Sequence, residues 1–146
     1  MLKNIPAILS PELLKTLCEM GHSDRIIIAD GNFPAESMGK NCKVIRADGH
    51  GVPELLDAIL QVMPLDAYVE TPVMLMERMK CDLDMELPLW TRYEQIVVAH
   101  DERGAQAFGA YERFEFYRQA QRCFCIIQTS EQSQYANIIL QKGIVK

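Results

Sequence analysis

The sequence lacks the marks of several large protein classes. It has no cluster of lysine and arginine, and its formal net charge is −5 at pH 7, so no basic surface is predicted for nucleic acid. No apolar run is long enough to cross a bilayer, and the N-terminus lacks a basic region followed by a hydrophobic one. Neither GxGxxG nor a P-loop occurs, which argues against nucleotide binding. We therefore expect a cytoplasmic protein without a nucleic-acid or membrane partner.

Cysteine pairing is also missing. The 5 cysteines include no CxxC pair, which argues against a disulfide framework and a zinc ribbon. Cys123 and Cys125 are expected on one face of a strand, where two thiolates could hold a metal. Because no histidine lies near them in the sequence, reduced core cysteines and no metal site are the favoured interpretation.

What is present is typical of a globular chain. Hydrophobic residues make up 49% and charged residues 24% of the 146 positions, enough to bury a core within one domain spanning residues 1–146. The 8 methionines are many for this length and suggest additional apolar surface at a subunit interface.

Strand and helix patterns alternate along the chain. Helical spacing and capping signals predict helices over residues 11–20, 53–63, 88–102 and 113–122. Apolar runs predict strands over 26–30, 44–45, 73–76, 108–112, 123–129 and 138–140. Residues 78–86 show no clear period and are expected to form a mobile connection. The alternation predicts an α/β protein with a largely parallel sheet.

The first predicted strand carries a polar side chain near each end. His22 follows the helix stop at Gly21, in a loop before the strand, and Asp30 stands at the carboxyl end of the strand. In open α/β sheets ligands bind beyond the carboxyl ends of strands, and catalytic groups are common in such loops. The alternatives are a surface histidine and a turn-forming aspartate.

Other residues allow two interpretations each. Asp66, Tyr68 and Glu70 alternate onto one side of the chain and line either a site or, as favoured, an exposed edge. Phe33 either caps a pocket or, as favoured, packs on its own core. His100 lies on the polar side of its helix and is expected to be solvated.

Five motifs distributed over nearly the whole chain carry a resemblance. They are Gly21-His22-x-Asp24, Asp30 with Phe33-Pro34, Arg46-Ala47-Asp48-Gly49, Arg113-Phe114-x-Phe116-Tyr117, and Tyr135-x-Asn137-Ile138-Ile139-Leu140 with Lys142-Gly143. Together they resemble the family of D-ribose pyranases and L-fucose mutarotases, and they are most similar to its fucose mutarotase branch.

The resemblance implies a cytoplasmic sugar isomerase that needs neither metal nor cofactor. It implies a three-layer α/β/α fold assembled into a ring-based homodecamer with sites at subunit contacts. The residue matching the proton donor of the family is His22. The residues matching the sugar-binding positions are Asp30, Arg113, Tyr135, Ala136 and Asn137. Ala136 departs from the glycine usual in fucose mutarotases and matches the ribose type, which bears on sugar preference.

The implied reaction suits these residue types. Exchange between the α and β anomers of L-fucose requires proton removal from the anomeric hydroxyl and proton delivery to the ring oxygen. An imidazole with an ordinary pKa of about 6.5 can do both near neutral pH. The alternatives are a ribose-type exchange between pyranose and furanose rings by the same opening step, and a non-catalytic monosaccharide-binding protein.

Overall fold

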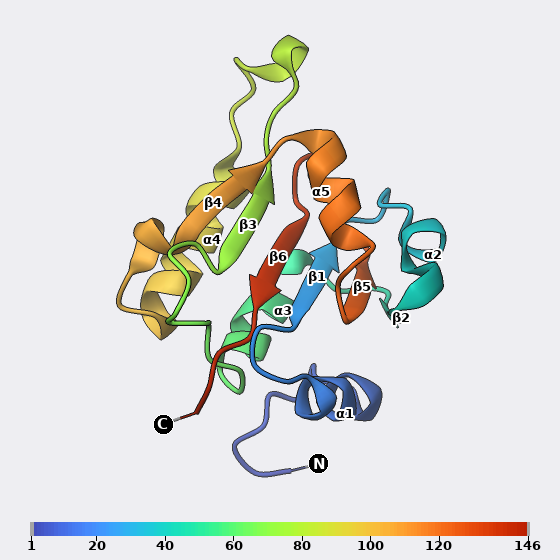
Figure 1. Cartoon of the computed structure of the whole chain (residues 1–146), viewed down its shortest axis with the longest axis vertical. Helices are drawn as coiled ribbons and strands as arrows, with labels where there is room; N and C mark the ends of the chain where they lie inside the picture. Colours follow the sequence, from blue (N-terminus) through green and yellow to red (C-terminus); the bar gives the residue numbers. More distant parts are fainter. Residues whose placement is uncertain (1, 146) are drawn as a thin grey trace.

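A six-stranded sheet forms the centre of the computed structural model, which describes residues 2–145 (Figure 1). Its strands are β1 Arg25–Ala29, β2 Lys43–Ala47, β3 Val73–Met76, β4 Phe108–Tyr111, β5 Cys125–Thr129 and β6 Ile138–Gln141. Their order across the sheet is β2-β5-β1-β6-β3-β4. Only β6 runs antiparallel to its neighbours, β1 and β3, among these described strands. The prediction of a largely parallel sheet is confirmed.

Five α-helices accompany the described strands. They are α1 Pro11–Glu19, α2 Ala35–Met38, α3 Val52–Leu60, α4 Pro88–His100 and α5 Arg113–Ala120. In two of them the side chain of the N-cap residue accepts a hydrogen bond from the first turn: Ser10 Oγ accepts from the Leu13 N–H, and the Glu112 carboxylate accepts from the Phe114 N–H. Helix α2 was not predicted, since four residues are too few to show a helical period.

The helices cover both faces of the sheet. Ile26 and Ile28 of β1 pack into one apolar cluster with residues of α1, α3 and α4, whereas Ile27 packs into a second cluster with Phe116 of α5. Successive strand residues point to opposite faces, so a strand that is apolar throughout requires cover on both. Figure 1 shows α3 behind the sheet and α5 in front of it. The three-layer α/β/α arrangement is thereby confirmed.

The antiparallel strand β6 brings the ends of other strands together. Ile138, at its start, is paired with Ile28 near the end of β1 and with Leu75 near the end of β3. The residues that follow β1 and β3 therefore lie at the same edge of the sheet as the residues that precede β6. This edge positions the candidate site.

The two neighbouring cysteines lie in different layers. Cys125 begins β5 and packs with the α1, α3 and α4 side, whereas Cys123 precedes the strand and packs with Phe116. The prediction that they share one face of a strand is therefore wrong, because the regular strand begins two residues later than expected. Burial raises the pKa of each thiol to about 12.

Residues 2–145 contain no cluster of three or more His, Cys, Asp or Glu side chains arranged to hold a metal ion. None of their helices has the length and apolar character needed to span a membrane.

Candidate functional site

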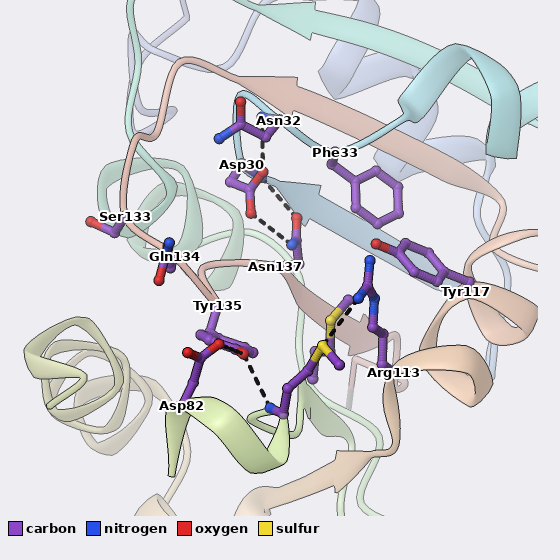
Figure 2. A pocket seen from close by; sticks show the side chains of 12 residues that line it. Asp30, Asn32, Phe33, Asp82, Arg113, Tyr117, Ser133, Gln134, Tyr135 and Asn137 are labelled. Atoms are coloured by element: carbon purple, nitrogen blue, oxygen red, sulfur yellow. Dashed lines mark hydrogen bonds between the residues drawn. The ribbon is translucent and has the colours of Figure 1, made fainter. Parts of the chain in front are cut away.

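A cavity of about 280 Å³ opens at the edge where β1 and β3 end and β6 begins (Figure 2). Its volume is near the lower end for small-molecule sites, which suits a ligand of few atoms. Polar side chains come from several segments of the chain, and apolar ones come from Phe33, Met76 and Met79. Of the predicted sugar-binding residues, the cavity is lined by Asp30, Arg113, Tyr135 and Asn137.

Asp30 and Asn137 form the buried floor of this cavity. Asn137 Nδ2 donates to Asp30 Oδ2 at 2.8 Å, and Asn137 Oδ1 accepts from the Asp30 backbone N–H at 2.9 Å. The other carboxylate oxygen, Asp30 Oδ1, accepts from the Asn32 N–H at 2.9 Å. Each carboxylate oxygen has more than one lone pair, so both remain able to accept from a ligand hydroxyl.

The burial of Asp30 changes its acidity. Only 7% of the residue is exposed, and this desolvation raises the pKa of the carboxyl above its ordinary value. The hydrogen bonds from the Asn32 and Phe33 backbones and from the Asn137 side chain act in the opposite direction. The site therefore holds a partly desolvated carboxyl whose interaction with hydrogen-bond donors is strengthened by its surroundings.

Arg113 stands at the first position of α5 with its guanidinium over the cavity. Its Nη1 lies 3.1 Å from the Met79 sulfur, and its guanidinium carbon lies 5.8 Å from the ring centroid of Tyr117. No carboxylate of residues 2–145 forms a salt bridge with it. Its donors are thus available to ligand oxygens.

Tyr135 forms the opposite wall and holds the segment after β3 in place. Its hydroxyl donates to Asp82 Oδ2 at 2.6 Å and accepts from the Met79 N–H at 3.1 Å. The hydrogen bond to Asp82 raises the pKa of the Tyr135 phenol. Residues 78–86 were expected to be a mobile connection, yet in the structure they supply Met79 and Asp82 to the cavity.

Two aromatic donors of α4 fix the segment that carries Tyr135 and Asn137. Trp90 Nε1 donates to the Tyr135 carbonyl at 2.8 Å, and the Tyr93 hydroxyl donates to the Ala136 carbonyl at 2.7 Å. Tyr135 has a φ of 56°, a left-handed conformation that costs a non-glycine residue free energy and persists only where neighbours enforce it. We attribute this conformation to the two hydrogen bonds from α4.

Ala136 is predicted to bind sugar, but its side chain does not reach the cavity. The residue is fully buried and is not among those that line the cavity. A ligand in the cavity therefore does not contact the methyl group that distinguishes alanine from glycine at this position. The identity of residue 136 is therefore a weak indicator of sugar preference.

His22 lies at the other edge of the sheet from the cavity. It precedes β1, whereas Asp30 follows it, and the two edges are separated by the strand length of about 13 Å. The imidazole is 42% exposed, its Nε2 lies 3.1 Å from Asp66 Oδ1, and its ring packs on Tyr68. Within one copy of the chain, His22 and the cavity are therefore not brought together.

The prediction that Asp66, Tyr68 and Glu70 form an exposed edge is correct for Tyr68 and Glu70 but not for Asp66. Tyr68 is 69% exposed, but Asp66 is only 1% exposed. The expectation for Asp66 is wrong, because Leu65 pairs with Lys142 and turns the next side chain inward, where Gln141 Nε2 donates to it at 2.9 Å. No sequence signal marked this, since the pairing joins segments far apart in the chain.

Phe33 and Tyr117 lie together at the cavity, whereas His100 lies away from it beside Asp57. Phe33 is 6% exposed, packs against Phe116 and Tyr117, and also lines the cavity, so both of its interpretations hold. Tyr117 lines the same cavity. His100 is not simply solvated, because its Nε2 lies 2.7 Å from Asp57 Oδ1.

The sequence profile of one family covers almost the entire chain. It is described as the RbsD / FucU transport protein family, and it matches residues 3–145. The chain belongs to this family. A fucose mutarotase of Homo sapiens is 46% identical over 147 residues, with 99% of this chain and 94% of the relative covered. The resemblance inferred from the five motifs is confirmed.

Solved structures of the RbsD / FucU family superpose closely. FucU from Bifidobacterium longum is 57% identical with a TM-score of 0.96, covering 99% of this chain and 100% of that one. The fucose mutarotase from Streptococcus pneumoniae, solved in complex with L-fucose, is 43% identical with a TM-score of 0.92 and the same coverage.

Proposed function

We propose that this protein is an L-fucose mutarotase, an isomerase that interconverts the α and β anomers of L-fucose. One observation carries the proposal. The cavity gathers polar side chains from three separate segments, namely Asp30, Arg113, and Tyr135 with Asn137, in a chain that is 43% identical over 99% of its length to a fucose mutarotase bound to L-fucose. No cofactor is invoked, because opening and closing a hemiacetal needs only proton transfer.

The cavity residues are assigned to holding the sugar. The Asp30 carboxylate accepts hydrogen bonds from sugar hydroxyls, and the guanidinium of Arg113 donates to sugar oxygens in a planar fork. Tyr135 and Asn137 complete the polar contacts, with Ala136 fixing the backbone between them. The apolar side chains of Met76 and Met79 suit the C6 methyl group of a 6-deoxy sugar.

His22 is assigned as the proton-transfer group, and its position requires a second copy of the chain. Because it lies at the opposite edge of the sheet from the cavity, we propose that a neighbouring copy places its His22 at the mouth of this cavity. This is consistent with a cytoplasmic homo-oligomer, for which the family resemblance implies a decamer. The apolar surface at the N-terminal segment, with Leu2 at 70% exposed, is available for such contacts.

The imidazole takes the proton of the anomeric hydroxyl as the C1–O5 bond breaks with its electrons going to the ring oxygen, and the imidazolium so formed delivers its proton to that oxygen. The open aldehyde rotates about the C1–C2 bond, and the C5 hydroxyl attacks the other face of C1 with the reverse proton transfers. Proton transfer by a well-placed histidine contributes about 10²- to 10⁴-fold to the rate.

Saturation-transfer NMR on L-fucose, with D-ribose as a second sugar, tests the proposal. The wild type should accelerate exchange between the anomers of fucose, and His22→Ala should remove the acceleration while leaving the circular dichroism spectrum unchanged. Wild-type exchange no faster than in buffer would refute the enzymatic function. Acceleration limited to the ring forms of ribose would select the pyranase reaction.

Mixing two variants tests whether the site is shared. His22→Ala and Asp30→Asn are each expected to be nearly inactive. After co-refolding in equal amounts, about a quarter of the sites would combine an intact His22 from one copy with an intact Asp30 from its neighbour. Recovery of about a quarter of the wild-type rate supports shared sites, and no recovery argues against them.

A second function is favoured by one observation. The cavity of a single copy contains no histidine among its lining residues, so a monosaccharide-binding protein without catalysis fits that cavity equally well. Fucose binding by titration calorimetry together with unaccelerated anomer exchange in the wild type would select this function.

A further inference from the structure

The loop that carries His22 is held by a residue from the other end of the chain. His22 lies within residues 21–24, between the C-terminus of α1 and the start of β1. Lys142, which directly follows β6, contacts the chain on both sides of His22. Figure 1 shows the chain leaving β6 beside the loop that joins α1 to β1.

The side chain of Lys142 binds the end of α1. Its Nζ donates to the Leu17 carbonyl at 2.7 Å and to the Met20 carbonyl at 2.6 Å. The last carbonyls of a helix have no partner within the helix, and the last turn of α1 contains no basic residue of its own. Lys142 therefore supplies both the hydrogen-bond donors and the positive charge that this helix end requires, two residues before His22.

The backbone of Lys142 holds the other side of the loop. Its carbonyl accepts from the Ser23 N–H at 2.9 Å, and its N–H donates to the Asp24 carbonyl at 2.8 Å. Ser23 has a φ of 70°, a left-handed conformation that persists in a non-glycine residue only where neighbours enforce it. His22 is thus placed between two segments that are both bound to Lys142.

The ammonium of Lys142 is directed at the backbone and not at an acidic side chain. No carboxylate of residues 2–145 forms a salt bridge with it. The residue is half-buried, whereas a lysine without a carboxylate partner usually extends its ammonium into water. The contacts indicate a side chain that serves to fix the local backbone.

We propose that Lys142 is a positioning residue, which fixes residues 21–24 so that the imidazole of His22 meets the sugar in one orientation. The inference rests on the proposed function. Proton transfer requires the imidazole nitrogen within about 2.6–3.2 Å of the sugar oxygen, and a displacement of about 1 Å can lower a rate about 100-fold. Without the Lys142 ammonium, the end of α1 and the loop after it can shift relative to β6, and His22 shifts with them.

Substitutions at Lys142 separate this role from that of a helix cap alone. Lys142→Met keeps the unbranched apolar stem and removes the ammonium, so it should lower kcat for anomer exchange about 10-fold. The KM for fucose should stay within about twofold, because Lys142 is not among the residues that line the cavity. Lys142→Arg keeps the charge and the donors, and it should restore kcat to within about threefold of the wild type.

Lys43→Met provides the matched control at the same helix end. Lys43 forms a salt bridge with the side chain of Glu19, the last residue of α1, and its loss should change kcat and KM by less than about twofold. A kcat of Lys142→Met within twofold of the wild type would overturn the proposal, even if the protein unfolded at a lower temperature. A helix cap without a positioning role changes stability and leaves the rate of the folded enzyme as it is.

A measurement on His22 itself does not depend on activity. In ¹H–¹³C NMR of protein labelled at its 3 histidines, the ring signal of His22 should shift or broaden in Lys142→Met, whereas those of His50 and His100 should stay in place. An unchanged His22 signal would overturn the proposal. Absence of anomer exchange in the wild type would refute the proposed function instead, and the NMR comparison would still decide whether Lys142 fixes the loop.

Discussion

Asn137 holds both the backbone and the side chain of Asp30, although 107 residues separate them in the sequence. One amide accepts from the Asp30 N–H and donates to its carboxylate, so the start of β6 is tied to the end of β1. Because both residues are buried, water cannot replace either partner at low cost. The same pair thus contributes to the fold and forms the floor of the cavity.

Removing the Asn137 amide should destabilise the protein and abolish binding. Asn137→Ala leaves the Asp30 N–H and carboxylate without these partners, and we expect the free energy of unfolding to fall by about 2 kcal/mol. Urea unfolding measures this change. Gln134→Ala is the control, because Gln134 lines the same cavity from an exposed position and should change the unfolding free energy by less than about 0.5 kcal/mol. Equal effects of the two substitutions would contradict the role of the pair.

The ionisation of Asp30 should lower the free energy of unfolding as pH rises. Burial raises its pKa in the folded protein, so the folded state holds this proton more tightly than the unfolded chain. Its contribution is therefore fully present below the unfolded pKa, about 3.9, and is lost as pH rises through the folded pKa. Compared with the wild type, Asp30→Asn should be less destabilised at pH 7 than at pH 4 in urea unfolding. The opposite order would contradict the assigned direction.

Asp66 should act in the opposite sense. Its pKa of about 2 in the folded protein lies below that of the unfolded chain, so its contribution is present above about pH 4 and is lost as pH falls toward 2. We expect a loss of about 1 to 2 kcal/mol over this range in the wild type. In urea unfolding, a plot of the free energy of unfolding against pH should lack this decrease for Asp66→Asn. Parallel curves for the two proteins between pH 2.5 and 5 would contradict the prediction.

Substitutions of the two aromatic donors of α4 should have different effects, one on the free energy of unfolding and the other on sugar binding. Tyr93→Phe removes the donor to the buried Ala136 carbonyl, which should cost about 1 to 2 kcal/mol of unfolding free energy. Trp90→Phe frees the Tyr135 carbonyl nearer the cavity, so we expect about a threefold to tenfold increase in KM from a less fixed Tyr135.

Tyr111→Phe provides the control for this pair. Tyr111 packs beside the second apolar cluster, and removal of its hydroxyl should change neither quantity appreciably. Thermal unfolding and anomer-exchange kinetics measure the three variants. A KM unchanged in Trp90→Phe would show that the Tyr135 segment does not depend on this hydrogen bond.

Local sequence patterns predicted most of the helices and strands but did not identify every residue that lines the cavity. The helix that begins after Ser10 and the strand from Arg25 were predictable, because caps and apolar runs act over a few residues. Met79 and Asp82 could not be recognised as cavity residues, since their segment has no periodicity and is placed by contacts with Tyr135.

The sequence by itself determined which residues form strands and helices, the α/β class, and the set of polar side chains suited to a sugar. Only the tertiary structure decided which of these side chains meet. The antiparallel course of β6 joins Asn137 to Asp30, whereas the length of β1 keeps His22 at the far edge beside Asp66. The physical reason is that periodicity reports on a residue's nearest neighbours in the chain, whereas strand order and burial depend on pairings between distant segments.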